Sequence, residues 1–118
     1  MNNHVYYVAI EWKDIDKIKQ GNFQFNESHE VNTVFGRALV LYENIKEANA
    51  PGQPVARVVL RNEPEPVDYI ISEDFIENSL EKFEKNNTKV IELWPPNGSD
   101  DTQIIVFDTS CIYQISVV

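Results

Sequence analysis

Carboxylates are the residues of this chain best suited to recognition chemistry, and they are concentrated in its second half. Residues 1–59 contain seven acidic and six basic residues, whereas residues 60–118 contain twelve acidic and four basic residues. This asymmetry indicates one strongly negative face, which attracts positively charged partners over long distances. The plainer alternative is a solvated helix surface whose charge only keeps the protein soluble. The carboxylates that we assign to a candidate binding surface are Glu63, Glu65, Asp68, Asp74, Glu77, Glu81, Glu84, Asp100 and Asp101.

Trp94 adds an aromatic anchor to this candidate surface. It lies next to Pro95-Pro96, in a segment that continues to Asp100 and Asp101. Tryptophan is enriched at the energetic centres of protein interfaces, and prolines reduce the entropy lost when a loop is ordered. The competing interpretation is that Trp94 ends a strand and packs into the core.

The residue types that carry out catalysis are few, and their spacing matches no catalytic or cofactor-binding motif. The chain has four glycines and neither a Gly-x-Gly-x-x-Gly nor a Walker sequence, so nucleotide fingerprints are absent. One cysteine and two histidines, His4 and His29, are too few for a structural zinc site. Cys111 lies in an apolar strand pattern and is expected to be a buried hydrophobic side chain. We therefore expect no catalytic residue, no metal and no cofactor.

Length and composition predict a single domain, residues 1–118, because 42% of the residues are hydrophobic and can form a core. The net charge of −9 disfavours direct binding of DNA or RNA, since proteins that hold phosphate backbones are usually basic. No apolar run approaches the roughly 20 residues of a membrane span, and Met1–His4 shows no secretory signal. A single cysteine suits a reducing compartment, so we expect a cytoplasmic protein without membrane association.

Two main helices are expected. Residues 28–48 form the longer one, with Ser28 as its N-cap, and residues 73–85 form the other, capped by Ser72. Both segments carry apolar residues at spacings of three and four, which is typical of a helix that buries one stripe. These stripes consist of Val31, Val34, Phe35, Ala38, Tyr42 and Ile45 in the first helix and Phe75, Ile76, Leu80 and Phe83 in the second.

The remaining segments favour strands and turns, and together they predict an α+β fold. Residues 62–66 hold two prolines and are expected to form a stiff loop, whereas Phe23–Phe25 fits a short edge strand. The last two strands are expected to form an antiparallel hairpin through a turn at Asp108–Ser110. We expect a mainly antiparallel sheet of about five strands with the two main helices packed on it. The main strand segments are residues 5–12, 55–61, 89–94, 103–107 and 111–117.

An acidic surface without a catalytic constellation predicts a protein that binds a basic protein partner. The leading hypothesis is an immunity or inhibitor protein that covers the active site of a basic toxin such as a nuclease, because nucleases are positive where they hold phosphates. A first alternative is a nucleic-acid mimic from a phage or mobile element that inhibits a host defence enzyme. A second alternative is an assembly subunit or adaptor that uses an open sheet edge.

Overall fold

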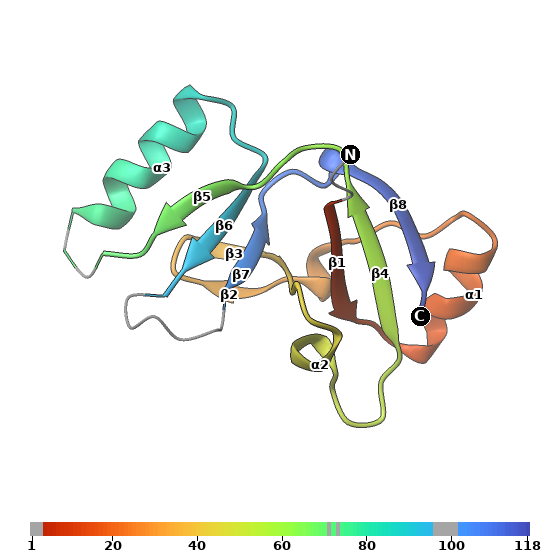
Figure 1. Cartoon of the computed structure of the whole chain (residues 1–118). Helices are drawn as coiled ribbons and strands as arrows, with labels where there is room; N and C mark the ends of the chain where they lie inside the picture. Colours follow the sequence, from red (N-terminus) through yellow and green to blue (C-terminus); the bar gives the residue numbers. More distant parts are fainter. Residues whose placement is uncertain (1–3, 71, 73, 96–101) are drawn as a thin grey trace.

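Two β-sheets organise the chain, for which the computed structural model describes residues 4–70, 72, 74–95 and 102–118 (Figure 1). The smaller sheet has three antiparallel strands in the order β1-β4-β8. Its central strand is β4, so β1 and β8 are edges. The bounds of these strands are His4–Ala9 for β1, Val55–Leu60 for β4 and Ile112–Val117 for β8.

The larger sheet has five strands in the order β2-β3-β7-β6-β5. Its neighbours are antiparallel except β5 and β6, which run parallel. The strands are β2 (Val31–Thr33), β3 (Gly36–Leu41), β5 (Glu65–Asp68), β6 (Val90–Trp94) and β7 (Gln103–Val106).

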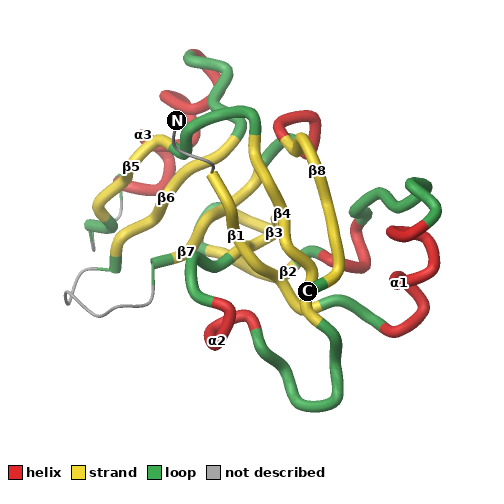
Figure 2. The backbone as a smooth tube through the Cα atoms, turned by 45° about the vertical axis from the view of Figure 1, so that its right-hand side comes forward, coloured by secondary structure: helices red, strands yellow, loops and turns green. Residues whose placement is uncertain are grey.

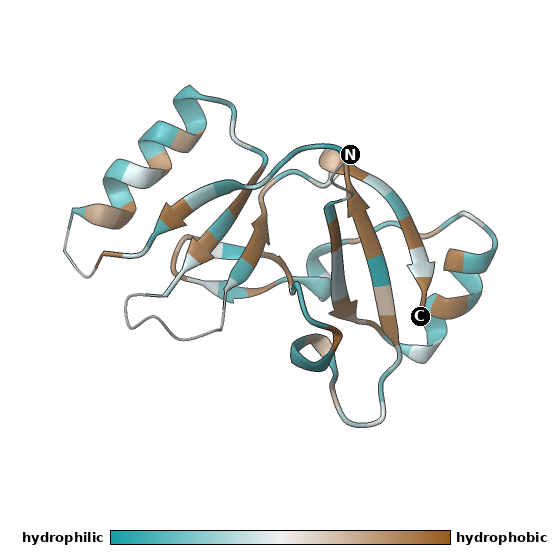
Figure 3. Cartoon of the chain, viewed as in Figure 1, coloured by the Kyte–Doolittle hydropathy of each residue, from teal (hydrophilic) through white to brown (hydrophobic). Residues whose placement is uncertain are grey.

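Three helices accompany the sheets in the described part of the chain: α1 (Trp12–Lys19), α2 (Ile45–Ala48) and α3 (Phe75–Lys85). In Figure 1, α1 lies beside β8 at one end of the molecule, and α3 lies beside β5 and β6 at the other end. Figure 3 shows apolar residues concentrated on the strands of both sheets, whereas α3 is largely hydrophilic. The α+β fold and the mainly antiparallel pairing predicted from the sequence are therefore confirmed.

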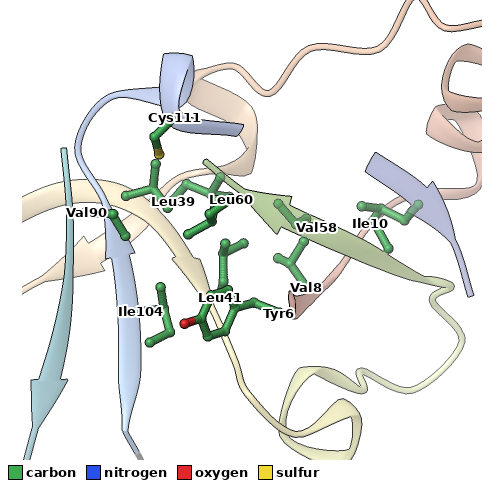
Figure 4. Packing of buried hydrophobic residues seen from close by; sticks show 12 residues of the cluster. Tyr6, Val8, Ile10, Leu39, Leu41, Val58, Leu60, Val90, Ile104 and Cys111 are labelled. Carbon is green, nitrogen blue, oxygen red and sulfur yellow. The ribbon is translucent and has the colours of Figure 1, made fainter. Parts of the chain in front are cut away.

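The larger hydrophobic core lies between the two sheets (Figure 4). Side chains of β1 and β4 meet those that β3, β6 and β7 present on their facing side, and Leu41, Val58 and Ile104 are fully buried there. Burial of such side chains is the main favourable term in folding, about 1.5–3 kcal/mol for each large aliphatic residue. The other buried members are Tyr6, Val8, Ile10, Leu39, Ala56, Leu60, Val90, Val106 and Cys111.

A second core lies on the opposite face of the larger sheet, beneath α3. Ile91 and Ile105 are fully buried in it, and Phe83 of α3 packs against them. The ring centroids of Phe35 and Phe83 lie 5.4 Å apart in an edge-to-face arrangement, which aromatic rings prefer. The strands β3, β6 and β7 are thus covered on both faces.

The helix predicted for residues 28–48 is wrong, since this segment forms β2, β3 and the short α2. Gly36 has a φ of +106°, a conformation that interrupts any helix and opens the β2–β3 turn. Leu39 and Leu41 then point into the core between the sheets, while Ala38 and Val40 point towards α3. A strand covered on both faces is apolar at every position, so its apolar residues also match a helical spacing.

The predicted C-terminal hairpin is also wrong. β7 pairs with β3 and β6, whereas β8 crosses to the smaller sheet and pairs with β4. The larger sheet has the predicted five strands, and the described residues form a second sheet of three strands in addition. The proline-containing segment also contributes β5, which tolerates Pro66 because an edge strand needs ladder bonds on one side only.

Candidate functional site

The larger sheet separates the predicted site residues onto its two faces. Ile91 and Leu93 of β6 point into the core beneath α3, so Glu92 and Trp94 point to the opposite face. Asp68 of β5 is in register with Trp94 and lies on that same face. Glu65 is in register with Ile91 and lies on the α3 face, where Thr88 donates to its carboxylate over 3.4 Å.

Three carboxyl groups meet on the face opposite α3. The side chain of Glu43, which follows β3, and the indole N–H of Trp94 both lie close enough to the Glu92 carboxyl group to shift its pKa. Glu63, in the segment between β4 and β5, adds a third negative charge near Glu92. We call Glu43, Glu63 and Glu92 the carboxylate cluster.

Burial, followed by the hydrogen bond and the charge of Glu43, raises the pKa of Glu92 from its usual 4.5 to about 7. The indole N–H of Trp94 acts in the opposite direction because it stabilises the carboxylate. With a pKa of about 7, the Glu92 carboxyl holds a proton for part of the time near neutral pH.

Tyr6 of β1, in the smaller sheet, also lies near the carboxylate cluster. Burial first, and then the charges of Glu92, Glu43 and Glu63, raise the pKa of its phenol to about 12. A pair of backbone hydrogen bonds between Tyr7 and Tyr42, 2.7 and 2.8 Å long, joins β1 to the segment that carries Glu43. The carboxylate cluster therefore lies where the two sheets meet.

No cation compensates this cluster within the part of the chain that the structure describes. Among these residues the one Lys or Arg ion pair joins Lys13 to Glu11, and the ring of His29 contacts Asp14; both contacts lie in or near α1. Because the chain has a net charge of −9, repulsion makes the ionised form of each carboxyl group in the cluster less favourable. The arrangement has the chemistry of a receptor for a positive group, with Trp94, which is 43% exposed, at its rim.

The acidic residues of α3 form a separate row on the other side of the sheet. Asp74 is the N-cap residue of α3, and Glu77, Glu81 and Glu84 are exposed along the helix. Spacings of three and four place them on one helical face. The predicted site thus divides into the α3 row (Asp74, Glu77, Glu81 and Glu84) and the surface of Glu63, Asp68 and Trp94. Asp100 and Asp101 lie outside the described residues.

Glu43 and Glu92 are functional candidates that sequence reasoning missed. A signal existed for Glu92, because it is the one charged residue in the apolar strand Val90–Trp94. Glu43 gave none, since it fell within a segment predicted to be helical and becomes adjacent to Glu92 only through the strand order β3-β7-β6.

The histidine and cysteine side chains serve packing. His29 Nε2 lies 3.2 Å from Asp14 Oδ2, and its Nδ1 accepts the backbone N–H of Asn26 over 3.1 Å, so both ring nitrogens are engaged. Cys111 is fully buried, and burial raises the pKa of its thiol. No three His, Cys, Asp or Glu side chains among the described residues are arranged to hold a metal ion.

Comparisons with known proteins return no relatives: no family model, no curated protein and no solved structure matches this chain. Within the described residues, none of the helices combines the length and apolar character needed to cross a membrane.

Proposed function

We propose that this protein is a non-catalytic binding protein that neutralises a basic protein, as an immunity or inhibitor protein does when it covers the active site of a nuclease-like toxin. The observation that carries the proposal is the carboxylate cluster, which gathers Glu43, Glu63 and Glu92 beside Trp94 without a cationic partner among the described residues. The expected setting is the cytoplasm, where a single cysteine stays reduced.

The cluster is suited to receive a lysine or arginine side chain. A positive group placed beside Glu92 replaces the proton that this carboxyl group holds near neutral pH, because a nearby cation favours the ionised form. Arginine suits this role especially, because its guanidinium donates to two carboxylates in fixed geometry. Binding should therefore release a proton and be tighter above pH 7 than at pH 5.

Long-range electrostatics would assist the encounter with such a partner. Complementary charge raises association rates well above the neutral range of about 10⁵–10⁶ M⁻¹s⁻¹, and salt reduces this gain. Trp94, at the rim of the cluster, would become buried on binding. It would then add short-range binding energy to the long-range attraction, since aromatic side chains are enriched among the residues that dominate binding energy at interfaces. An enzyme that holds phosphates presents the complementary positive surface.

The test begins with capture of a binding protein from source-cell lysate at low and high salt. Its association rate is then compared for the wild type and two variants with the same charge change: Glu43→Lys/Glu63→Lys in the cluster and Glu77→Lys/Glu81→Lys in the α3 row. The proposal requires a basic captured protein whose activity is inhibited, and slower association for the cluster variant only. An acidic or neutral captured protein, or equal rates for the cluster variant and the wild type, would refute it.

The second candidate function is a nucleic-acid mimic, and the α3 row favours it. Its exposed carboxylates follow one helical face, with one charge about every 5 Å at a rise of 1.5 Å per residue. Duplex DNA carries one charge per about 1.7 Å of axis, so the row is sparse for a mimic of a full duplex. Slower association for the α3-row variant only would support the mimic instead of the inhibitor.

A further inference from the structure

The strand β8 leaves part of its outer edge uncovered. It pairs with β4 on one side, and Figure 2 shows it at the rim of the smaller sheet with α1 on its other side. The backbone N–H of Val118 donates to Val55, so the backbone groups of Ser116 and Gln114 also face β4. Because these groups alternate along a strand, those of Ile115 and Val117 face away from β4.

The segment Phe23–Phe25 lies opposite this edge. Its sequence favours a strand, yet it is irregular, and no hydrogen bond among the described residues involves the backbone groups of its three residues. It is nevertheless well positioned, since the rings of Phe23 and Phe25 lie 4.9 Å apart edge to face and each is 5.3 Å from His29. His29 is held in turn by Asp14 and by the backbone of Asn26.

A cavity of about 510 Å³ separates the two segments. This volume lies within the range of about 300–1,000 Å³ that is usual for ligand sites. Its apolar walls come from Ile18, Phe23, Phe25, Ile112 and Ile115, and Asp108 is the one charged side chain among its lining residues. We call this cavity the β8 groove.

We propose that the β8 groove binds a short extended segment of another protein, which adds as a strand between β8 and Phe23–Phe25. Side chains alternate along such a segment, so every second one enters the groove. These side chains are apolar except at the end of the segment, where a lysine or arginine lies beside Asp108. Addition of a strand to a sheet edge gains affinity from main-chain hydrogen bonds and specificity from alternate side-chain pockets. The inserted strand would also give Phe23–Phe25 the pairing partner that it lacks.

Two features favour a short segment over a second copy of this chain. The helix α1 contacts β8 and lies beside the C-terminal end of this strand (Figure 1), where it restricts access to the edge. A register shift between Val59 and Leu60 marks a β-bulge in the β4–β8 pair, at the other end of β8. Bulges and covering helices both restrict the pairing of whole edge strands, so only a few residues can enter.

Asp108 gives the groove its charge preference. Its carboxylate accepts the backbone N–H of Ser110 over 2.9 Å, and this hydrogen bonding lowers the pKa of Asp108, so the group is an anion. Lys89 is the nearby cation, and its Nζ donates to Ser110 Oγ over 3.3 Å. Because Lys89 offsets part of the charge of Asp108, we expect preference for a single basic residue in the bound segment.

The test uses a blocked pentapeptide, acetyl-Val-Thr-Val-Thr-Lys-amide, in which both valines and the lysine share one face, titrated into the ¹⁵N-labelled full chain. Chemical shifts should change at residues 23–25 and 112–115, and the amide of Ile115 should exchange more slowly with solvent. The amide of Gln114 faces β4 and serves as the internal control, with unchanged exchange. The same peptide with alternate amides N-methylated cannot form the ladder and should bind at least about tenfold more weakly.

Two outcomes overturn the proposal. The first is equal affinity of the methylated and unmethylated peptides, which would show that main-chain hydrogen bonds do not hold the segment. The second is a set of shift changes confined to the carboxylate cluster or the α3 row, which would show simple attraction of a cation. Asp108→Asn provides the charge test: it should lower the affinity for the lysine peptide several-fold and leave that of its glutamine analogue unchanged. This inference is independent of the proposed function, because its groove shares no residue with the cluster.

Discussion

The raised pKa of Glu92 predicts that removing its carboxyl group stabilises the protein at alkaline pH. Glu92 has a pKa of about 7 in the folded chain, against a usual value of 4.5. Between these values the folded state holds a proton that the unfolded state has lost, so the free energy of unfolding falls as pH rises. This contribution is fully present below pH 4.5 and is lost once the pH passes about 7.

The magnitude follows from the size of the pKa change and the exposure of the group. At ~1.4 kcal/mol per pH unit, the change corresponds to about 3 kcal/mol for a carboxyl fully removed from water. Glu92 is only partly buried, and solvent screens the repulsion from Glu43 and Glu63. We therefore expect about 1 kcal/mol.

The perturbation is Glu92→Gln, which keeps a hydrogen-bond donor towards Glu43 and cannot ionise. Its free energy of unfolding should match that of the wild type at pH 4.5 and exceed it by about 1 kcal/mol at pH 8. The assay is urea denaturation followed by circular dichroism at constant ionic strength, in steps across this range. Glu84→Gln, which removes an exposed carboxyl of the α3 row, controls for the loss of one charge. A stability difference for Glu92→Gln that is constant with pH, or that changes in the opposite direction, would refute the raised pKa of Glu92.

Four further predictions test the remaining structure. Trp94→Phe removes the indole N–H that favours the Glu92 carboxylate, so ¹³C NMR titration should show a higher pKa for Glu92; an unchanged value would contradict that contact. Gly36→Ala should lower stability by about 1 kcal/mol or more in urea, because φ is +106° there while a Cβ would meet no atom within 4 Å. Asp14→Ala should cost about 1–3 kcal/mol, since the buried carboxylate accepts hydrogen bonds from His29 and from the backbone. Cys111 should react with a thiol reagent only as fast as the protein unfolds, and rapid labelling of the native state would show that its burial is transient.

Local patterns predicted those elements whose burial follows a single periodicity. α3 was predicted because Phe75, Ile76, Leu80 and Phe83 recur at helical spacing, and Phe83 of this stripe packs into the core beneath the helix. The segment Gly36–Leu41 was not, because both faces of β3 are covered and its apolar run carries no distinctive period. The apolar periodicity of a segment shows which of its faces is exposed to solvent. A strand that is covered on both faces has no exposed face, so its sequence has no such periodicity.

The site was predicted in part for a related reason. Glu63 and Trp94 stand out locally, one beside prolines and the other at the end of a strand. Their relation to Glu43 and Glu92 depends on β7 lying between β3 and β6, and on β1 bringing Tyr6 to the same junction. The order of strands in a sheet depends on contacts between residues far apart in the sequence, so the spacing of residues along the chain does not predict it.

The crossing of the chain between sheets has a kinetic consequence. β3 acquires its central neighbour β7, and β4 its outer neighbour β8, only after the ribosome has made nearly all of the described chain. Domains dominated by such distant pairings fold slowly, within about milliseconds to seconds. The chain loses entropy when it closes long loops, before the paired strands contribute any stabilising contacts. Until β7 arrives, the apolar strand β3 has an open edge that invites association with other chains. A nascent chain of this protein is therefore more vulnerable to aggregation than the finished fold, and rapid completion of synthesis, or a chaperone that shields β3, protects its yield.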